Sequence, residues 1–184
     1  HPGFSGMFLS LVFFGFIGGI SGVVLGTEQL NVLMHNTIYV PGHFHGTVVA
    51  GTTLAFMAAT YLVLPLVFQR EIVWPALAKI QPYLFGIGVA GISLFMMGAG
   101  TLGVARRHWD ITFSDAEFSF AYSAGAFLMM GLNGIFAIIA AIGGALFVVI
   151  AVATVLFGKR LKAGDKLVFP LHKGGGAAVS HYGG

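Results

Sequence analysis

The sequence predicts an all-α integral membrane protein, a bundle of four transmembrane helices. Of its 184 residues, 57% are hydrophobic and only 8% are charged, whereas soluble domains contain roughly a quarter charged residues. The apolar residues gather in four segments, each long enough for the roughly 20 helical residues that cross the hydrocarbon core. None shows the short alternating pattern of a transmembrane β-strand.

The four predicted spans are separated by short polar loops. We place them at about residues 6–26, 42–68, 81–105 and 121–157. The last is longer than one crossing requires, so it is expected to tilt or to extend beyond the bilayer. Residues 1–158 then form the membrane segment, and residues 159–184 a basic, Gly-rich tail. The chain begins with His1 rather than Met, and we expect a processed, split or partly represented polypeptide.

The loop charges predict the orientation of the spans. Lys and Arg accumulate on the cytoplasmic side of membrane proteins, and one side of the bundle carries Arg70, Lys79, Lys159, Arg160, Lys162, Lys166 and Lys173. The other side has Arg106, Arg107, Glu28, Asp110, Asp115 and Glu117. The C-terminus is therefore expected in the cytoplasm. The net charge of +3 reflects this topology, and no nucleic-acid partner is expected.

Histidine is the expected metal ligand. The chain has seven histidines and no cysteine, which rules out iron–sulfur clusters and thiolate zinc sites. His35, His43 and His45 lie in a charge-free stretch at the predicted outer end of the second span. Ionisable residues inside a membrane segment mark functional sites by default, although histidines that only hydrogen-bond within the bundle are the simpler alternative.

The spacing of His43 and His45 predicts two separate centres. Residues two apart on an α-helix lie about 200° apart around its axis, so the two imidazoles cannot chelate one ion. Pro41 and Gly42 suit a helix start just before them. Imidazole is a common axial ligand of haem iron, and an apolar haem suits the space between transmembrane helices. The pair therefore points to two haems, one on each side of the helix.

The run from His35 to His45, HNTIYVPGHFH, resembles the tenth-helix signature of subunit I of haem-copper oxidases, and its Asn36 and Val-Pro-Gly-His wording is most similar to the B-type, or ba-type, branch. The resemblance covers most of the chain and makes its spans helices nine to twelve of a twelve-helix or larger subunit. It implies that His43 ligates the iron of a high-spin haem and His45 that of a low-spin haem.

A second motif supports the resemblance. Arg106 and Arg107, before an acidic loop, are similar to the paired arginines that bind the haem propionates in this family, and guanidinium groups suit carboxylates. The resemblance places His35 near the propionates too. In A-type members that histidine adjoins a magnesium site, but here Asn36 and Asn31 stand where carboxylates are usual. The loss of two hard oxygen ligands argues against magnesium.

The resemblance implies an enzyme of which this chain is an incomplete part. The expected activity is reduction of oxygen to water with electrons from cytochrome c or a similar donor, coupled to proton translocation across a prokaryotic cell membrane. Copper would be ligated by residues outside this chain. The expected partners are the remainder of subunit I, a copper-bearing subunit II, the electron donor and membrane lipid.

Two alternatives remain at this point. A nitric oxide reductase-type subunit also has closely spaced haem histidines, and the metal content of the intact complex, copper or non-haem iron, would separate it from an oxidase. A di-haem membrane cytochrome that only transfers electrons would need two histidines for each low-spin haem. Only His43 and His45 lie within the predicted spans.

Overall fold

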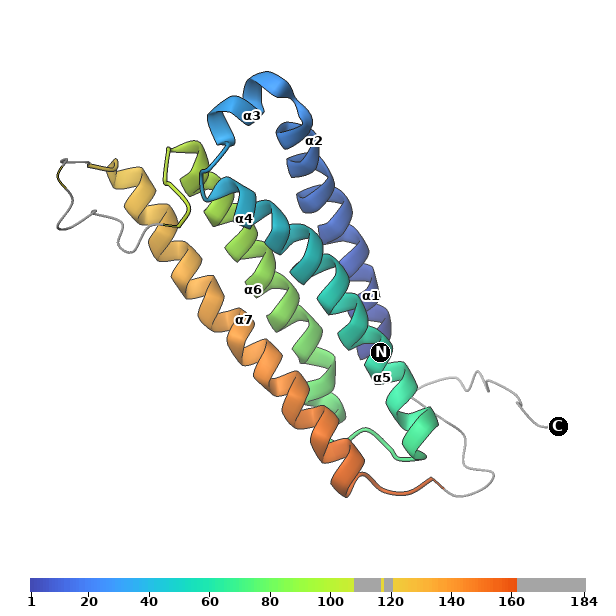
Figure 1. Cartoon of the computed structure of the whole chain (residues 1–184). Coiled ribbons are helices and arrows are strands. Elements are labelled where there is room, and N and C mark those ends of the chain that lie inside the picture. The colour runs from blue at the N-terminus through green and yellow to red at the C-terminus, as the bar shows by residue number, and fades with distance from the viewer. Residues whose placement is uncertain (108–116, 118–120, 162–184) are drawn as a thin grey trace.

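A computed structural model describes residues 1–107, 117 and 121–161, and the described chain is helical throughout apart from two isolated β-bridges. The elements, in chain order, are α1 (Pro2–Val12), η1 (Phe13–Gly19), α2 (Ile20–Gly26), α3 (Glu28–Met34), α4 (Tyr39–Phe44), η2 (His45–Thr53), α5 (Leu54–Phe68), α6 (Pro75–Thr101) and α7 (Ala124–Phe157). Here η1 and η2 are π-helical stretches inside longer helices. Figure 1 shows that these elements run roughly along one direction as a bundle.

Four continuous helical stretches are long and apolar enough to cross a membrane, and this result confirms the predicted fold class. They are Pro2–Gly26, Tyr39–Phe68, Pro75–Thr101 and Ala124–Phe157, hereafter the first to fourth spans. The first, second and third spans start earlier in the sequence than predicted. The third begins at Pro75, because proline fits the first turn of a helix where its missing N–H is not needed. It also ends earlier, at Thr101, followed by Gly103 with a φ of +85°.

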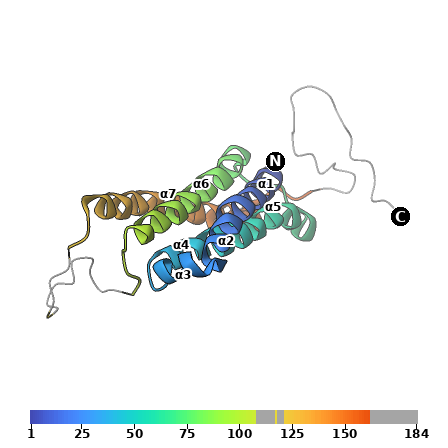
Figure 2. The same cartoon turned by 90° about the horizontal axis from the view of Figure 1, so that it is seen from above.

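The third span is the centre of the bundle. In its most apolar 18-residue window 56% of the residues are buried, against 17% in the first and the fourth spans. Figure 1 shows α6 between α7 and the second span, and Figure 2 shows the same bundle from above, where α6 and α7 cross. Close approach to α7 needs glycine: a Cβ on Gly88 would lie 2.5 Å from the Ala140 nitrogen, and one on Gly143 would lie 2.5 Å from the Phe85 nitrogen. Small residues are thus the means by which these spans pack, as is usual in lipid.

Two short antiparallel contacts tie the ends of the bundle together. At the α3 end, Thr37 pairs with Ala105, and we call residues 36–38 with 104–106 the outer clip, after the orientation that the loop charges predict. At the other end, Arg70 pairs with Arg160, and residues 69–71 with 159–161 form the inner clip. Each clip joins the second span to a neighbour that is distant in sequence, and so limits how far the spans can slide past each other.

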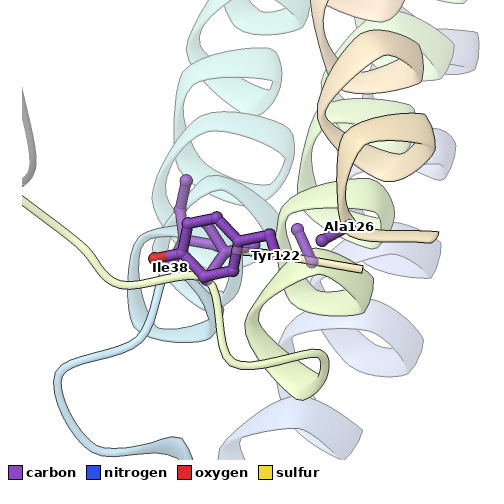
Figure 3. Close-up of a cluster of buried hydrophobic side chains, with 5 residues drawn as sticks. Ile38, Tyr122 and Ala126 are labelled. Atoms are coloured by element: carbon purple, nitrogen blue, oxygen red, sulfur yellow. The ribbon is translucent and has the colours of Figure 1, made fainter. Parts of the chain in front are cut away.

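A small apolar cluster packs beneath the outer clip. It consists of Ile38, Ala99, Val104, Tyr122 and Ala126, with Met96, Met129 and Met130 against it (Figure 3). The Tyr122 hydroxyl accepts a 3.0 Å hydrogen bond from the Ala105 nitrogen. The methionines pack here as apolar side chains. The outer clip is therefore held both by hydrogen bonds and by burial.

His1 lies directly before α1. Its ring is half-buried, and its Nδ1 accepts a 2.9 Å hydrogen bond from the Gly3 nitrogen, which caps α1. An N-cap acceptor of this kind satisfies one of the free N–H groups at a helix start. His108, most of the acidic loop and the tail from residue 162 lie outside the described residues.

We predict that Gly143→Val lowers the thermal stability of the membrane complex that contains this chain. Overpacking of this kind costs about 1–3 kcal/mol, because the new side chain meets the backbone of α6. Gly134→Val in the same helix is the matched control, since a Cβ there meets nothing within 4 Å. Thermal unfolding of the purified complex checks the prediction, and equal melting temperatures for the two variants would refute it.

Candidate functional site

His43 lies in α4 and its ring is held by the first span. Its Nδ1 is 2.8 Å from the Ser21 Oγ of α2, and Ser21 is almost fully buried. The Ser21 hydroxyl is also within hydrogen-bond distance of the Gly18 carbonyl, at 3.0 Å. A serine has one proton to donate, and a backbone carbonyl can only accept. The consistent arrangement has Nδ1–H of His43 donating to Oγ, which leaves the Nε2 lone pair for a metal ion.

His45 is anchored within its own helix. It is the first residue of η2, and its Nδ1 lies 2.8 Å from the Pro41 carbonyl oxygen. Since a carbonyl only accepts, Nδ1–H is the donor and Nε2 carries the lone pair. Histidines that ligate metals almost always donate their other ring N–H in this way, which fixes the tautomer and the ring orientation. Both His43 and His45 thus have the form of a metal ligand.

The two rings lie on different sides of the second span. The backbone stays helical through this stretch, with φ and ψ of −63° and −34° at Phe44 and −63° and −37° at His45, so the separation of about 200° applies. His43 contacts α2. His45 lies on the other side, near Val48, which is three residues further along the helix and 50% exposed.

A third face of the same helix is fixed against α6. A Cβ on Gly46 would lie 2.9 Å from the Ser93 Oγ, and one on Gly42 would lie 2.8 Å from the Met97 side chain. The Ser93 hydroxyl, fully buried, donates a 2.6 Å hydrogen bond to the Gly42 carbonyl. This contact prevents rotation of the segment that carries both histidines.

The first span presents a glycine face next to His43. Gly15, Gly19, Gly22 and Gly26 are spaced by four, three and four residues, the spacing of one face of a helix. A Cβ would meet nothing within 4 Å at Gly15 or Gly26, and only the Phe14 carbonyl at 3.8 Å at Gly19. At Gly22 it would lie 3.3 Å from the Cε1 of His43. The helix thus forms a flat wall beside that ring.

The π-helical stretches of the first and second spans lie against each other next to this wall. A Cβ on Gly18 of η1 would lie 2.6 Å from the Thr47 side chain of η2. Each stretch is wider than an α-helix, and π-helical turns are often found at functional sites. The widening starts at His45, so it changes the directions of the residues that follow the two histidines.

The outer clip positions Arg106. Its backbone nitrogen donates a 3.0 Å hydrogen bond to the Asn36 carbonyl, and its Nη2 donates one of 2.7 Å to Asn36 Oδ1. Asn36 has a φ of +61°, a left-handed conformation that asparagine tolerates better than most residues. The Arg106 Nε is buried and has no partner among the described residues. A buried, charged donor without a partner is costly, and an acceptor such as a carboxylate would satisfy it.

The other two predicted outer residues are less constrained. His35, the residue after α3, is exposed. Arg107 is exposed and has a φ of +64°. Both lie next in sequence to members of the outer clip, so the clip brings His35, Arg106 and Arg107 to the same end of the bundle. Among the described residues no group of three or more His, Asp or Glu side chains is placed to hold a metal ion.

Three residues of this site were missed in the sequence. Ser21 and Ser93 each stand in an apolar span, where a lone hydroxyl was not distinguished from the small residues that favour helix packing. Asn36 was noted for its resemblance to the B-type branch and as a replacement for an aspartate, whereas in the structure it holds Arg106. Two signals in the sequence could have identified these residues: a serine within a Gly-rich helix face, and an asparagine shortly before a helix.

The known proteins to which this chain is similar are oxidase subunits. The family model described as cytochrome c and quinol oxidase polypeptide I matches residues 4–146. Cytochrome c oxidase subunit 1 of Thermus thermophilus is 34% identical over 119 residues, 63% of this chain and 21% of that protein. Cytochrome c oxidase polypeptide 1 of Halobacterium salinarum is 32% identical over 117 residues, 61% of this chain and 19% of that protein. The chain therefore covers about a fifth of these relatives.

The fold has a solved counterpart. A cryo-EM structure of a haem-copper terminal oxidase dimer superimposes with a TM-score of 0.76 at 32% sequence identity, and covers 88% of this chain and 28% of that chain. The four apolar spans, together with this family, make the chain a multi-pass membrane protein. The match over residues 4–146 shows that the chain belongs to the family of cytochrome c and quinol oxidase polypeptide I.

Proposed function

We propose that this chain is the C-terminal part of the catalytic subunit of a B-type haem-copper terminal oxidase, which reduces oxygen to water with electrons from cytochrome c or a similar donor and translocates protons. The observation that carries the proposal is the pair of anchored imidazoles. His43 and His45 each have Nδ1 engaged in a 2.8 Å hydrogen bond, and each keeps Nε2 for a metal on a different side of one helix.

In this proposal His43 ligates the iron of the high-spin haem. The glycine face of the first span supports that role, because a planar macrocycle needs a wall without side chains close to its axial ligand. Gly19 and Gly22 provide such a wall beside His43. Ser21 acts through His43: as the acceptor of Nδ1–H it orients the ring and raises the basicity of the ligand.

In the same proposal His45 ligates the iron of the low-spin haem. It lies on the side of the second span where the apolar Val48 is exposed. The second ligand of the low-spin haem would come from helices in the rest of the subunit. The haems and copper, when bound, supply the redox chemistry, whereas this chain supplies ligation, orientation and charge.

Arg106 is proposed to bind a haem propionate through its buried Nε. Asn36 holds the other end of the guanidinium by a 2.7 Å bond, so the free N–H is already oriented when the carboxylate arrives. A planar guanidinium with one anchored nitrogen recognises a carboxylate with little further loss of side-chain entropy. Arg107 and His35 are proposed to contribute at the same end, and the cytoplasmic side is then the end that carries the inner clip.

We predict that the two histidines have separable spectroscopic roles in the complete enzyme. His45→Ala should remove the low-spin haem absorbance, and His43→Ala should alter the high-spin haem while the low-spin bands remain. His35→Ala, which changes a histidine of the same loop that the proposal places at the propionates, is the control and should retain both. Optical spectra of the reduced and carbon monoxide-bound complexes check this. Unchanged haem spectra for both alanine variants would refute the assignment.

Ser21→Ala should weaken the bond between His43 and iron. Without the acceptor, Nδ1–H loses its partner and the ring donates less electron density, so the iron–histidine stretching frequency of the high-spin haem should fall. Loss of an outer-shell partner commonly costs 10–100-fold in metal affinity or activity. Resonance Raman spectroscopy measures the frequency.

Ser10→Ala is the matched control for Ser21→Ala. Ser10 is also buried in the first span, and its hydroxyl donates a 2.7 Å hydrogen bond to the Gly51 carbonyl of the second span. The control variant should lose stability but keep the iron–histidine frequency. An equal frequency shift in both variants would mean that Ser21 acts only on packing.

Arg106→Gln should move the potential of the neighbouring haem to more negative values, because a cation near the propionates favours the reduced form. The change should be no larger than roughly 60 mV, the equivalent of a tenfold change for a one-electron couple. Spectroelectrochemical titration of the complex measures it. Lys79→Gln removes a charge from the opposite end of the bundle and should leave the potential unchanged; the same shift in both variants would refute the role of Arg106.

A further inference from the structure

Two arginines lie side by side in the inner clip. Arg70 and Arg160 form an antiparallel bridge. The flanking hydrogen bonds run from the Glu71 nitrogen to the Lys159 carbonyl and from the Leu161 nitrogen to the Gln69 carbonyl, both at 2.9 Å. This pattern makes Arg70 and Arg160 a non-hydrogen-bonded pair, the pair type in which directly opposed side chains on one face lie closest.

Among the described residues, the positive charge of this pair has no carboxylate paired with it. Arg70 donates through Nη1 to the Gly158 carbonyl at 2.7 Å, which anchors its guanidinium at the end of α7 and leaves its other N–H groups. Arg160 is exposed. Within residues 1–107, 117 and 121–161, no carboxylate forms an ion pair with either guanidinium. Like charges directly opposite each other are destabilising, so the pair favours an anion between or beside the two groups.

The two arginines line a pocket that lies next to an apolar groove. The pocket has a volume of about 390 Å³ and is lined by Phe68, Gln69, Arg70, Val155, Arg160 and Leu161. A second hollow of about 280 Å³ between α5 and α7 is lined by Leu64, Ala151, Val152, Val155 and Leu156. Val155 lines both. The cationic pocket and the apolar hollow therefore adjoin each other at Val155 of the fourth span.

We propose that this site binds one anionic glycerophospholipid, with its phosphodiester on Arg70 and Arg160 and an acyl chain along Leu64 and Val155. Arginine suits phosphate oxygens through charge-assisted, often bidentate hydrogen bonds. The groove lies along a membrane span, where acyl chains are the surrounding solvent. A free phosphate would use the arginines but not the groove. The end of the bundle is also the one predicted to face the anionic cytoplasmic leaflet.

The test measures lipid retention by the complete membrane complex. Complexes are placed in nanodiscs of dioleoyl phosphatidylglycerol mixed with dioleoyl phosphatidylcholine, extracted, and analysed by native mass spectrometry for bound lipid. The wild-type complex should retain phosphatidylglycerol several-fold more than phosphatidylcholine. Arg160→Gln should abolish that preference, because it removes the exposed guanidinium and spares the anchor made by Arg70. Val155→Phe should reduce retention of both lipids by filling the junction of pocket and groove.

Lys159→Gln is the matched control. It removes the same charge from the adjacent residue, but successive side chains of an extended segment point to opposite sides, and Lys159 does not line the pocket. The control should keep the preference for phosphatidylglycerol. Equal loss in Lys159→Gln and Arg160→Gln would overturn the site in favour of general surface charge. Displacement of the lipid by millimolar inorganic phosphate, or equal retention of the two lipids by the wild type, would also overturn it.

Discussion

Close packing of the second span against α6 is the constraint on which the candidate site depends. Gly42 and Gly46 allow the two helices to approach, and the Ser93 hydroxyl bonds the Gly42 carbonyl at 2.6 Å. With one face of the helix held in this way, the directions of His43 and His45 follow from helical geometry. In lipid the packing is made by van der Waals contact and interhelical hydrogen bonds, so small residues and a hydroxyl serve here where a soluble protein would bury large side chains.

The serine hydroxyls within the spans either bond to the backbone of a neighbouring helix or orient a histidine ring. Ser10 and Ser93 each bond a backbone carbonyl of the second span, and Ser21 bonds the ring of His43. These contacts all act on one helix, the one that carries both histidines. The site is therefore built as a single positioned helix, which neighbouring spans hold from two sides.

The two clips use one backbone pattern at opposite ends of the bundle. In the outer clip the paired residues are Thr37 and Ala105, and a single arginine beside them is oriented by an asparagine. In the inner clip the paired residues are both arginines. The same short antiparallel contact thus orients the Arg106 donor at one end and forms a cationic pocket at the other. The two results differ because the residues that pair in each clip are different.

The sequence by itself determined the fold class, the number of spans and the family. Four long uncharged segments permit little else than transmembrane helices, and the run from His35 to His45 predicted two ligands on opposite helix faces from spacing alone. The histidines' assigned roles remain predictions. The first residues of the spans were predicted less accurately than their number. Pro75 and Tyr39 lie in stretches where polar and apolar residues mix, and the first turn of a helix has no periodic pattern of apolar residues.

Only the tertiary structure decided which groups hold the site in place. Ser21 lies 22 positions before His43, and Asn36 lies 70 before Arg106; no local pattern links residues so far apart. The glycine wall beside His43 and the pairing of Arg70 with Arg160 depend likewise on how separate helices meet. Hydrophobic patterning specifies that a segment spans the membrane, whereas side-by-side contacts between spans arise from packing and hydrogen bonds that form only when the whole bundle assembles.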